Sequence, residues 1–339
     1  MDSPAVALPV VDRRNRALRD LRVSVTDRCN FRCPYCMPRD AFGGHRFLPK
    51  AEILTFEEIS RVVGVSVVLG VRKVRLTGGE PLLRSELPEL VRMLRRIGDL
   101  DLALTTNGSL LERFAPALAE AGLGRVTVSL DSLDPPVFKR MSDTDVPVET
   151  VLRGIEVARV AGLTPLKVNS VIQRGVNEAS IVELARRFRG TGVIVRFIEY
   201  MDVGSTNGWS PKSVVPAREI LDRIDREFPL EPVSEAARGR VARRYRYRDG
   251  SGEIGVIASV SEPFCGGCTR ARLSANGHLY TCLFATKGTD LRPVLRNGSG
   301  DDAVRDVVKA TWERRDDRYS ETRFVSGPAE SVEMSFIGG

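Results

Sequence analysis

Histidine is almost absent from this chain: among 339 residues only His45 and His278 occur. Mechanisms that pair a serine or cysteine nucleophile with a histidine base are therefore disfavoured. Aromatic residues make up only 6% of the chain, which argues against an RNA-binding surface built from stacked aromatic side chains. The sequence also lacks an uninterrupted apolar run of about 18 residues, the length that a membrane-spanning helix needs.

The N-terminus carries no apolar signal core, so we expect a cytoplasmic protein without a membrane segment. Hydrophobic residues at 42% and charged residues at 28% are typical of a soluble globular chain. The net charge of +7 favours anionic partners such as nucleotides or phosphorylated metabolites. Charge alone does not separate such a site from a solvated basic surface, and we do not expect nucleic acid as the partner.

The six cysteines fall into two triplets with different spacing. They are Cys29, Cys33 and Cys36 in a C-x3-C-x2-C pattern, and Cys265, Cys268 and Cys282 in a C-x2-C-x13-C pattern. In a large chain with no export signal, this grouping favours metal ligation over disulfides. Zinc normally takes four ligands, whereas three thiolates on a four-iron cluster leave one iron open. A zinc site completed by His278 remains an alternative for the second triplet.

Six short apolar runs, each bounded by turn residues, alternate with helical segments. We predict strands over 21–26, 73–77, 102–106, 125–130, 166–172 and 193–198. This rhythm predicts parallel β/α units with right-handed crossovers. Six units fall short of the eight of a closed TIM barrel, so we predict an α/β fold with an incomplete (β/α)6 TIM-like barrel.

Three regions follow from this pattern. We expect a loosely held N-terminal leader over 1–20, the partial barrel over 21–201, and a C-terminal α+β extension over 202–339. The extension should contain a helix over 217–227, a hairpin over 245–257 and a helix over 301–314. Polar residues collect just after the barrel strands, at 27, 77–80, 105–107, 129–131 and 199–201. Because the carboxyl ends of parallel strands form one rim, the site should lie there.

Several basic residues fit an anion site. Arg270 and Arg272 point the same way if their segment is extended, and guanidinium forks suit phosphate oxygens. Arg75 and Arg196 are predicted to point into the barrel. A buried arginine without an anion is costly, so inward arginines themselves predict a bound anion.

The first triplet, with Tyr35 before its last cysteine and with Gly78-Gly79-Glu80-Pro81 after a strand, resembles the cluster motif of radical S-adenosylmethionine (radical SAM) enzymes. Together with the second triplet, Arg270-Ala271-Arg272 and the terminal Gly338-Gly339, the chain from residue 21 on resembles the GTP 3′,8-cyclase family of molybdenum cofactor biosynthesis. The resemblance implies two [4Fe-4S] clusters, one per cysteine triplet, with S-adenosylmethionine at the first. An electron donor would reduce the first cluster, and a 5′-deoxyadenosyl radical would take the ribose 3′ hydrogen of GTP. The product would be (8S)-3′,8-cyclo-7,8-dihydroguanosine 5′-triphosphate, the substrate of a cyclic pyranopterin monophosphate synthase.

The resemblance also assigns residues by matching positions. S-adenosylmethionine would contact Tyr35, Gly79, Glu80, Ser129 and Met201, with Glu80 receiving its ammonium group. GTP would contact Arg22, Arg75, Thr105, Lys167, Arg196, Arg270 and Arg272. The Gly338-Gly339 tail would enter the active site and, with Arg272, take part in the reaction. Read alone, Met201 would be ordinary core packing and the tail a frayed end.

Two other functions remain alternatives at this point. The first is a different radical SAM enzyme with an auxiliary cluster, of the peptide maturase type, although a peptide does not call for many inward arginines. The second is a non-catalytic iron–sulfur or zinc protein that binds RNA through its basic charge. The sequence does not give the oligomeric state, and a homodimer is compatible with it.

Overall fold

The computed structural model describes residues 9–233, 239, 241–326 and 331–338. In this part of the chain one sheet runs in the order β12-β11-β10-β1-β2-β3-β4-β5-β6-β9-β8-β7. The strands are β1 (Asp20–Ser24), β2 (Lys73–Thr77), β3 (Asp101–Thr106), β4 (Arg125–Ser129), β5 (Lys167–Ile172), β6 (Ile194–Glu199), β7 (Leu230–Pro232), β8 (Arg243–Tyr247), β9 (Glu253–Ile257), β10 (Arg270–Leu273), β11 (His278–Tyr280) and β12 (Thr289–Asp290).

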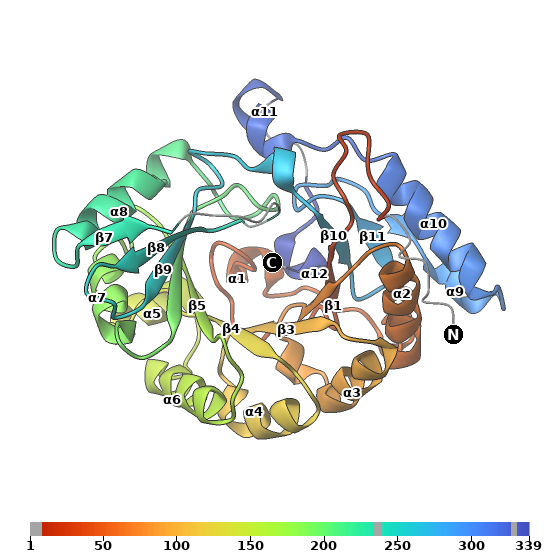
Figure 1. Ribbon diagram of the computed structural model, residues 1–339, viewed down its shortest axis with the longest axis horizontal. Coiled ribbons are helices and arrows are strands. Elements are labelled where there is room, and N and C mark those ends of the chain that lie inside the picture. Colours follow the sequence, from red (N-terminus) through yellow and green to blue (C-terminus); the bar gives the residue numbers. More distant parts are fainter. Residues whose placement is uncertain (1–8, 234–238, 240, 327–330, 339) are drawn as a thin grey trace.

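The sheet bends into a ring that stays open between its two end strands (Figure 1). Strands β1 to β6 pair in parallel and in chain order, which confirms the predicted incomplete barrel. The extension lengthens this parallel sheet at both sides, because β10 pairs with β1 and β9 pairs with β6. Antiparallel strands β8 and β7 then follow β9, while β11 and β12 follow β10.

Helices cover the outer face of the ring (Figure 1). They are α2 (Phe56–Val68), α3 (Leu87–Ile97), α4 (Leu111–Glu120), α5 (Pro135–Ser142), α6 (Val148–Val160), α7 (Ser180–Phe188), α8 (Ala217–Asp225) and α10 (Asp301–Glu313). Helix α2 begins at a capping box: Thr55 Oγ1 accepts from Glu58 N at 3.2 Å, and Glu58 Oε2 accepts from Thr55 N at 2.8 Å. No helix in the described residues is long and apolar enough to cross a membrane.

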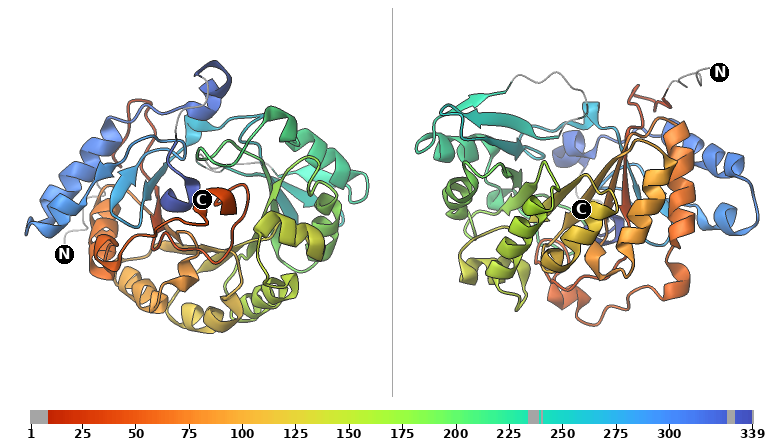
Figure 2. Two further views of the ribbon diagram at one scale, coloured as in Figure 1. Left: turned by 180° about the vertical axis from the view of Figure 1, so that it is seen from behind. Right: turned by 60° about the horizontal axis from the view of Figure 1, so that its bottom comes forward.

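Shorter helices lie in the loops and near the C-terminus. They are α1 (Arg39–Phe42), α9 (Arg292–Arg296), α11 (Tyr319–Ser326) and α12 (Met334–Ile337), with 3-10 turns η1 (Lys50–Glu52), η2 (Pro81–Leu83), η3 (Pro211–Ser213) and η4 (Cys265–Gly267). The loop that carries the first cysteine triplet and α1 lies across one mouth of the ring (Figure 2). Helix α12 reaches the inside of the ring near β1.

The strand side chains alternate between two environments. In β2, Val74 and Leu76 are fully buried in the hydrophobic core, whereas Lys73, Arg75 and Thr77 line a central cavity. The same alternation holds in β5 and β6, where buried Val168 and Phe197 belong to the core while Lys167, Asn169 and Arg196 line the cavity. Because polar residues face inward, the ring encloses a binding site rather than a packed apolar interior.

Part of the predicted leader is firmly packed. Val10 N donates to Leu69 O at 3.0 Å, and Leu18 N donates to Val10 O at 3.0 Å. The Leu18 side chain is buried in the main core. The expectation of a loosely held segment is therefore wrong for residues 9–19, because their apolar side chains and backbone groups find partners in the barrel. Residues 1–8 lie outside the described part.

Candidate active site

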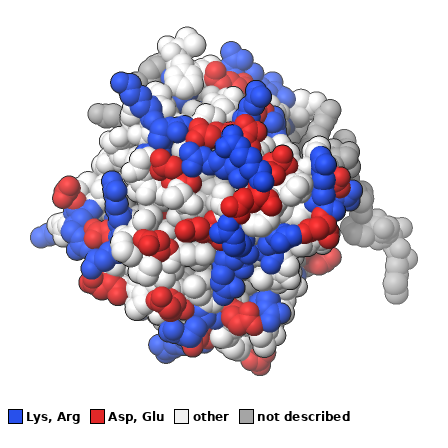
Figure 3. Space-filling view, turned by 90° about the vertical axis from the view of Figure 1, so that its left-hand side faces the viewer, with Lys and Arg blue, Asp and Glu red and all other residues white. Residues whose placement is uncertain are grey.

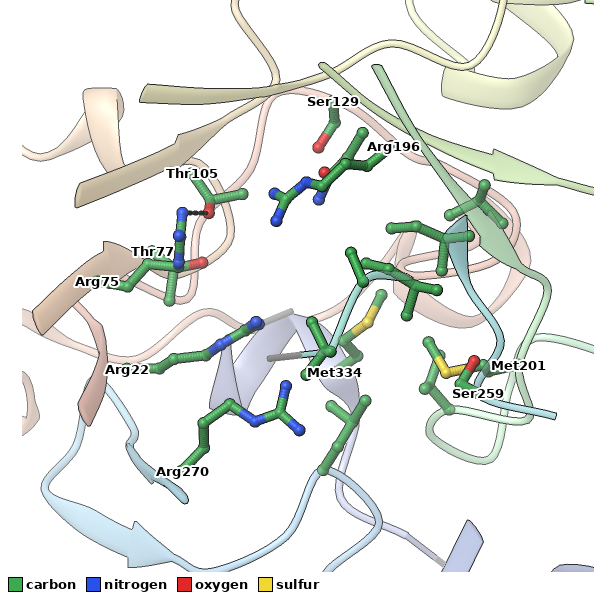
Figure 4. Close-up of a pocket in the computed structure, with 18 of the residues that line it drawn as sticks. Arg22, Arg75, Thr77, Thr105, Ser129, Arg196, Met201, Ser259, Arg270 and Met334 are labelled. Atoms are coloured by element: carbon green, nitrogen blue, oxygen red, sulfur yellow. Dashed lines mark hydrogen bonds between the residues drawn. The ribbon is translucent and has the colours of Figure 1, made fainter. Parts of the chain in front are cut away.

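A cavity of about 740 Å³ lies inside the ring, and both cysteine triplets line it. Figure 4 shows part of its lining. Most of the residues that the sequence assigned to ligands line it as well: Tyr35, Gly79, Ser129, Met201, Arg22, Arg75, Thr105, Lys167, Arg196, Arg270 and Arg272. The structure thus brings together residues from both ends of the chain. Glu80 and Gly338 lie just outside this lining, and Gly339 lies outside the described residues.

The first triplet occupies the loop after β1. Phe31 N donates to Cys29 Sγ at 3.4 Å, and the backbone N–H groups of Cys36 and Met37 both donate to Cys33 O at 2.9 Å. Burial raises the pKa of the Cys29 thiol to about 11 and raises the pKa values of Cys33 and Cys36 as well. Three half-buried thiols whose ionisation is opposed in this way fit a cluster whose iron ions would stabilise the thiolates.

The Gly78-Gly79 pair allows the end of β2 to approach this loop closely. A Cβ atom on Gly79 would lie 2.5 Å from the carbonyl carbon of Arg28 and 2.9 Å from Asp27 O. Gly79 N also donates to Thr26 O at 2.9 Å, and Glu80 N donates to Arg28 O at 2.7 Å. The two glycines therefore join the loop to the strand end without space for a side chain.

Glu80 is fully buried behind this turn. Its carboxylate accepts hydrogen bonds from Leu82 N at 3.0 Å, Thr106 Oγ1 at 2.7 Å and Asn107 N at 2.7 Å. Burial raises its pKa to about 7 in spite of these three donors. In this geometry Glu80 fixes the loops after β2 and β3, and its bond to a ligand ammonium stays a prediction.

Asp131 is a cavity residue that the sequence placed on the rim but did not assign. Its Oδ2 accepts from Tyr35 OH at 2.7 Å and its Oδ1 accepts from Val171 N at 2.8 Å. This carboxylate orients the tyrosine between the second and third cysteines. Lys73, Arg125 and Asn169 also line the cavity without having been assigned. Strand alternation could have found Lys73 and Asn169, since each lies two positions from an assigned residue.

The second triplet is built from η4 and the strands that follow it. Arg270 Nη2 donates to Cys268 Sγ at 3.4 Å. Burial opposes the Cys268 thiolate, but Arg270 and Arg315 outweigh it and lower the pKa of this thiol to about 6. Burial raises the pKa of Cys282 to about 11. As with the first triplet, three half-buried sulfur donors fit an iron–sulfur cluster, and here arginines lie beside them.

His278 is engaged away from the thiols. Its Nδ1 lies 3.1 Å from Asn276 Oδ1, and its Nε2 lies 4.0 Å from Asp290 Oδ2 across the β11–β12 pair. Among the described residues, no set of three His, Cys, Asp or Glu side chains lies close enough together to hold a single metal ion. The histidine contacts give no support to the zinc alternative.

Six cations of the cavity have no carboxylate within salt-bridge distance in the described part of the chain: Arg22, Arg75, Lys167, Arg196, Arg270 and Arg272. The nearby carboxylates already form ion pairs with other cations. Asp20 pairs with Lys73 at 3.3 Å, and Glu253 pairs with Arg244 at 2.7 Å. Asp101 pairs with Arg125. The guanidinium groups of Arg22, Arg75, Arg196 and Arg270 point toward the same central space (Figure 4).

Most of these cations have lowered pKa values, and Arg270 is the exception because, against the effect of burial, the Cys268 thiolate raises its pKa. Burial, followed by repulsion from Arg272, Arg270 and Arg75, lowers the pKa of Arg22. Burial and neighbouring arginines lower the pKa of Arg75 to about 10 and that of Arg196 to about 9. An anion placed among them would relieve this repulsion.

Arg75 and Arg196 also share one neutral acceptor. Arg75 Nη1 donates to Thr127 Oγ1 at 3.2 Å and to Thr105 Oγ1 at 3.0 Å. Arg196 Nη2 donates to the same Thr127 oxygen at 3.3 Å, and its Nε is buried without a partner among the described residues. Two guanidinium groups that meet at a hydroxyl retain spare donors for an anionic ligand.

The C-terminal tail contacts one of the cavity arginines. Arg272 Nη1 donates to Gly338 O. Gly338 has a φ of 77°, and a Cβ atom there would lie 3.0 Å from Ser24 Oγ and would also contact the Thr77 side chain. A glycine is needed at this position because both the positive φ and the lack of space exclude a side chain.

Family models divide the chain in two. The model described as Radical SAM superfamily matches residues 23–188, and the one described as Molybdenum Cofactor Synthesis C matches residues 193–321. Among solved structures, SuiB of Streptococcus suis bound to S-adenosylmethionine has a TM-score of 0.62 at 13% identity, covering 86% of this chain and 69% of that chain. This likeness concerns the fold alone.

Curated relatives are similar over nearly their whole length. The GTP 3′,8-cyclase of Acidothermus cellulolyticus is 53% identical, covering 98% of this chain and 99% of the relative. The enzyme of the same name from Xanthomonas axonopodis is 51% identical with the same coverage. That of Staphylococcus saprophyticus is 45% identical over 97% of this chain and 99% of the relative. The chain therefore belongs to the GTP 3′,8-cyclase family of radical SAM enzymes.

Proposed function

We propose that this chain converts GTP to (8S)-3′,8-cyclo-7,8-dihydroguanosine 5′-triphosphate, an early step of molybdenum cofactor biosynthesis. One observation carries the proposal. Two cysteine triplets and six cations without carboxylate partners in the described chain line one cavity of about 740 Å³. A reductive cluster and a highly charged anion can thus be held side by side.

Cys29, Cys33 and Cys36 are the proposed ligands of one [4Fe-4S] cluster, and Cys265, Cys268 and Cys282 of a second. When bound, the first cluster and S-adenosylmethionine supply a 5′-deoxyadenosyl radical that removes the ribose 3′ hydrogen of GTP. The half-buried positions of the thiols in the cavity wall, and the arginine beside the second triplet, support these assignments. Walls of buried strand residues would exclude water from the radical.

Tyr35, Gly79, Ser129 and Met201 are the proposed contacts of S-adenosylmethionine. All four line the cavity near the first triplet or at the strand ends beside it. Asp131 holds Tyr35 through its hydroxyl group at 2.7 Å, which would orient the ring against the cofactor. Glu80 is proposed to act by fixing the glycine turn that carries Gly79.

Arg22, Arg75, Thr105, Lys167, Arg196, Arg270 and Arg272 are the proposed contacts of GTP. A triphosphate carries about four negative charges at neutral pH, and charge-assisted bonds to guanidinium groups are among the strongest available. Arg272 also holds the carbonyl of Gly338, so we propose that it positions the Gly338-Gly339 tail beside the substrate.

The remaining expectations stay predictions. They concern an external electron donor, a downstream cyclic pyranopterin monophosphate synthase, a cytoplasmic location, a homodimer and the division of the chain at residues 20 and 201. The peptide maturase alternative has in its favour only the likeness in fold to SuiB, which has also been solved bound to a precursor peptide. The inward cations favour the nucleotide, because a peptide backbone does not neutralise them.

Anaerobic turnover tests the proposal. Reconstituted protein with dithionite and S-adenosylmethionine should form 5′-deoxyadenosine much faster when GTP is added, together with a modified guanine nucleotide. Guanosine, which lacks the phosphates, should stimulate far less. A rate of 5′-deoxyadenosine formation that does not respond to GTP would refute the assigned substrate.

A further inference from the structure

Three buried charged residues, two from the N-terminal segment and one from the C-terminal region, form a network beside the second cysteine triplet. The side chains of Asp12, Arg16 and Arg315 are 0%, 2% and 2% exposed. Arg16 Nε donates to Asp12 Oδ2 at 2.6 Å, and Arg315 Nη1 lies 3.4 Å from the same oxygen. Asp12 Oδ1 accepts from the backbone N–H of Arg16 at 2.9 Å.

Both arginines bind the backbone of the cysteine loop. Arg16 Nη1 donates to Cys265 O at 2.9 Å, and Arg315 Nη1 donates to Cys268 O at 2.8 Å. Arg16 Nη1 also donates to Asp317 O at 2.7 Å. The carbonyl groups of the first two cysteines of this triplet are therefore each fixed by a different arginine of one network.

Neighbouring contacts hold the network in place. Trp312 is buried, its Nε1 donates to Arg16 O at 3.0 Å, and its ring lies under Arg315 with the guanidinium carbon 4.5 Å from the ring centroid. On the other side of the cysteines, the backbone N–H groups of Arg19 and Asp20 both donate to Thr269 O at 3.1 Å. The N-terminal segment thus contacts the cysteine loop at both ends.

We propose that Asp12, Arg16 and Arg315 form a clamp that positions Cys265 and Cys268 for cluster binding. The inference rests on the proposed function, in which the second triplet holds a [4Fe-4S] cluster. Burying charges is costly unless they are paired, and here Asp12 pairs with both arginines while Arg315 Nε also pairs with Asp317 Oδ2 at 3.3 Å. One donor beside the loop is left over: Arg16 Nη2 is buried without a partner in the described chain, and a guanidinium group there complements the negative charge of thiolate-bound iron.

The clamp residues are positioning residues, because they act through the cysteine backbone. The segment 9–19 is thereby part of the second cluster site, although it precedes the barrel. Loss of either arginine should release the loop without disturbing the first triplet, whose ligands follow β1 and contact different residues.

Iron content after anaerobic reconstitution provides the test. Wild-type protein should hold about eight iron atoms per chain, and Arg16→Met and Arg315→Met should each hold about four. The electron paramagnetic resonance change that S-adenosylmethionine causes at the first cluster should persist in both variants. Arg95→Met is the matched control, because Arg95 also donates to two backbone carbonyls, Gly122 O at 2.6 Å and Leu100 O at 2.8 Å. It should retain about eight iron atoms.

Alkylation of cluster-free protein gives an independent readout. Mass spectrometry should show Cys265 and Cys268 reacting several-fold faster in Arg16→Met than in the wild type, with Cys29 and Cys33 unchanged. Wild-type protein with only about four iron atoms would refute the second cluster of the proposed function, while the alkylation rates would still test the clamp. Full iron loading with unchanged alkylation in both variants, or equal loss of both clusters, would overturn the clamp.

Discussion

Lys167 is the cavity cation whose charge can change near neutral pH. Burial, followed by repulsion from Arg196 and Arg125, lowers its pKa to about 7. In the unfolded chain a lysine titrates at about 10.4, so between these values the unfolded state holds the extra proton and stability rises with pH. Below pH 7 the folded protein carries the full cost of a charged lysine among arginines.

A triphosphate bound beside Lys167 would raise its pKa again, so binding at pH 8 should take up a proton. Affinity for GTP should then fall by up to about tenfold per pH unit above pH 7. Calorimetric titrations in two buffers of different ionisation enthalpy measure the uptake directly. Lys167→Arg stays charged and should abolish it, whereas Lys139→Arg, at an exposed ion pair, should not. Persistent uptake in Lys167→Arg would assign the proton elsewhere.

The inward arginines could be predicted from the sequence, whereas the hydrogen-bond partners of the carboxylates could not. Arg75 and Arg196 line the cavity as expected, because strand alternation and the cost of burial both point that way. The bond of Glu80 to a ligand ammonium stays a prediction, and its hydrogen bonds to Leu82 N, Thr106 Oγ1 and Asn107 N were not foreseen. A motif shows that an acid is present, whereas its hydrogen-bond partners depend on neighbouring loops that only the fold brings near.

Among the elements, the glycine turn after β2 allows a specific prediction. In Gly79→Ala the new Cβ would lie 2.5 Å from the carbonyl carbon of Arg28, a backbone atom that cannot move without the loop. The first triplet should therefore be displaced, with loss of about four of eight iron atoms while the second cluster remains. Iron analysis and the spectrum with added S-adenosylmethionine measure this.

Gly64→Ala is the matched control for this substitution. Gly64 lies within α2, and a Cβ there would have no neighbour within 4 Å. This variant should keep both clusters and gain about 0.5–1 kcal/mol of stability from helix propensity. A Gly79→Ala protein with normal iron content and cofactor binding would show that the close approach to Arg28 is not required.

Element positions were largely predictable, but strand neighbours were not. Strand β2 has the predicted bounds, and Arg270 and Arg272 lie on an extended strand, β10, which is the condition under which they were predicted to point the same way. The predicted hairpin is present as β8 and β9. The pairing of β10 with β1 and of β9 with β6 was missed, because alternation shows that a segment is a strand without identifying its partner.

For the whole molecule, the placement of charge matters more than its total. On the face shown in Figure 3, Lys and Arg side chains are interspersed with Asp and Glu. Ion pairs of this kind include Arg174 with Glu219 at 2.6 Å, and Arg186 with Glu227. The six cavity cations, by contrast, have no such partners in the described chain. Part of the positive charge of this chain, whose net charge is +7, therefore lies where a ligand can use it.

Because these six cations lie together in the cavity, we predict that a simple polyanion stabilises the folded protein. Tripolyphosphate at about one hundred times its dissociation constant should contribute about 2.7 kcal/mol, which corresponds to a rise in Tm of roughly 5 °C for a chain of this size. Sodium chloride at equal ionic strength, and guanosine without phosphates, should give much smaller shifts in differential scanning fluorimetry.

Arg196→Met should separate two opposite contributions of the cavity cations to stability: their mutual repulsion without a ligand and their attraction to a bound anion. Removing one buried cation relieves repulsion, so the variant without ligand should melt no lower than the wild type in spite of the lost contact with Thr127. The same variant should lose much of the tripolyphosphate shift, because one guanidinium no longer meets the anion. Arg218→Met removes an equal charge from a side chain that is 91% exposed, and it should keep the full shift. Equal losses in the two variants would mean that net charge, rather than the cavity, binds the anion.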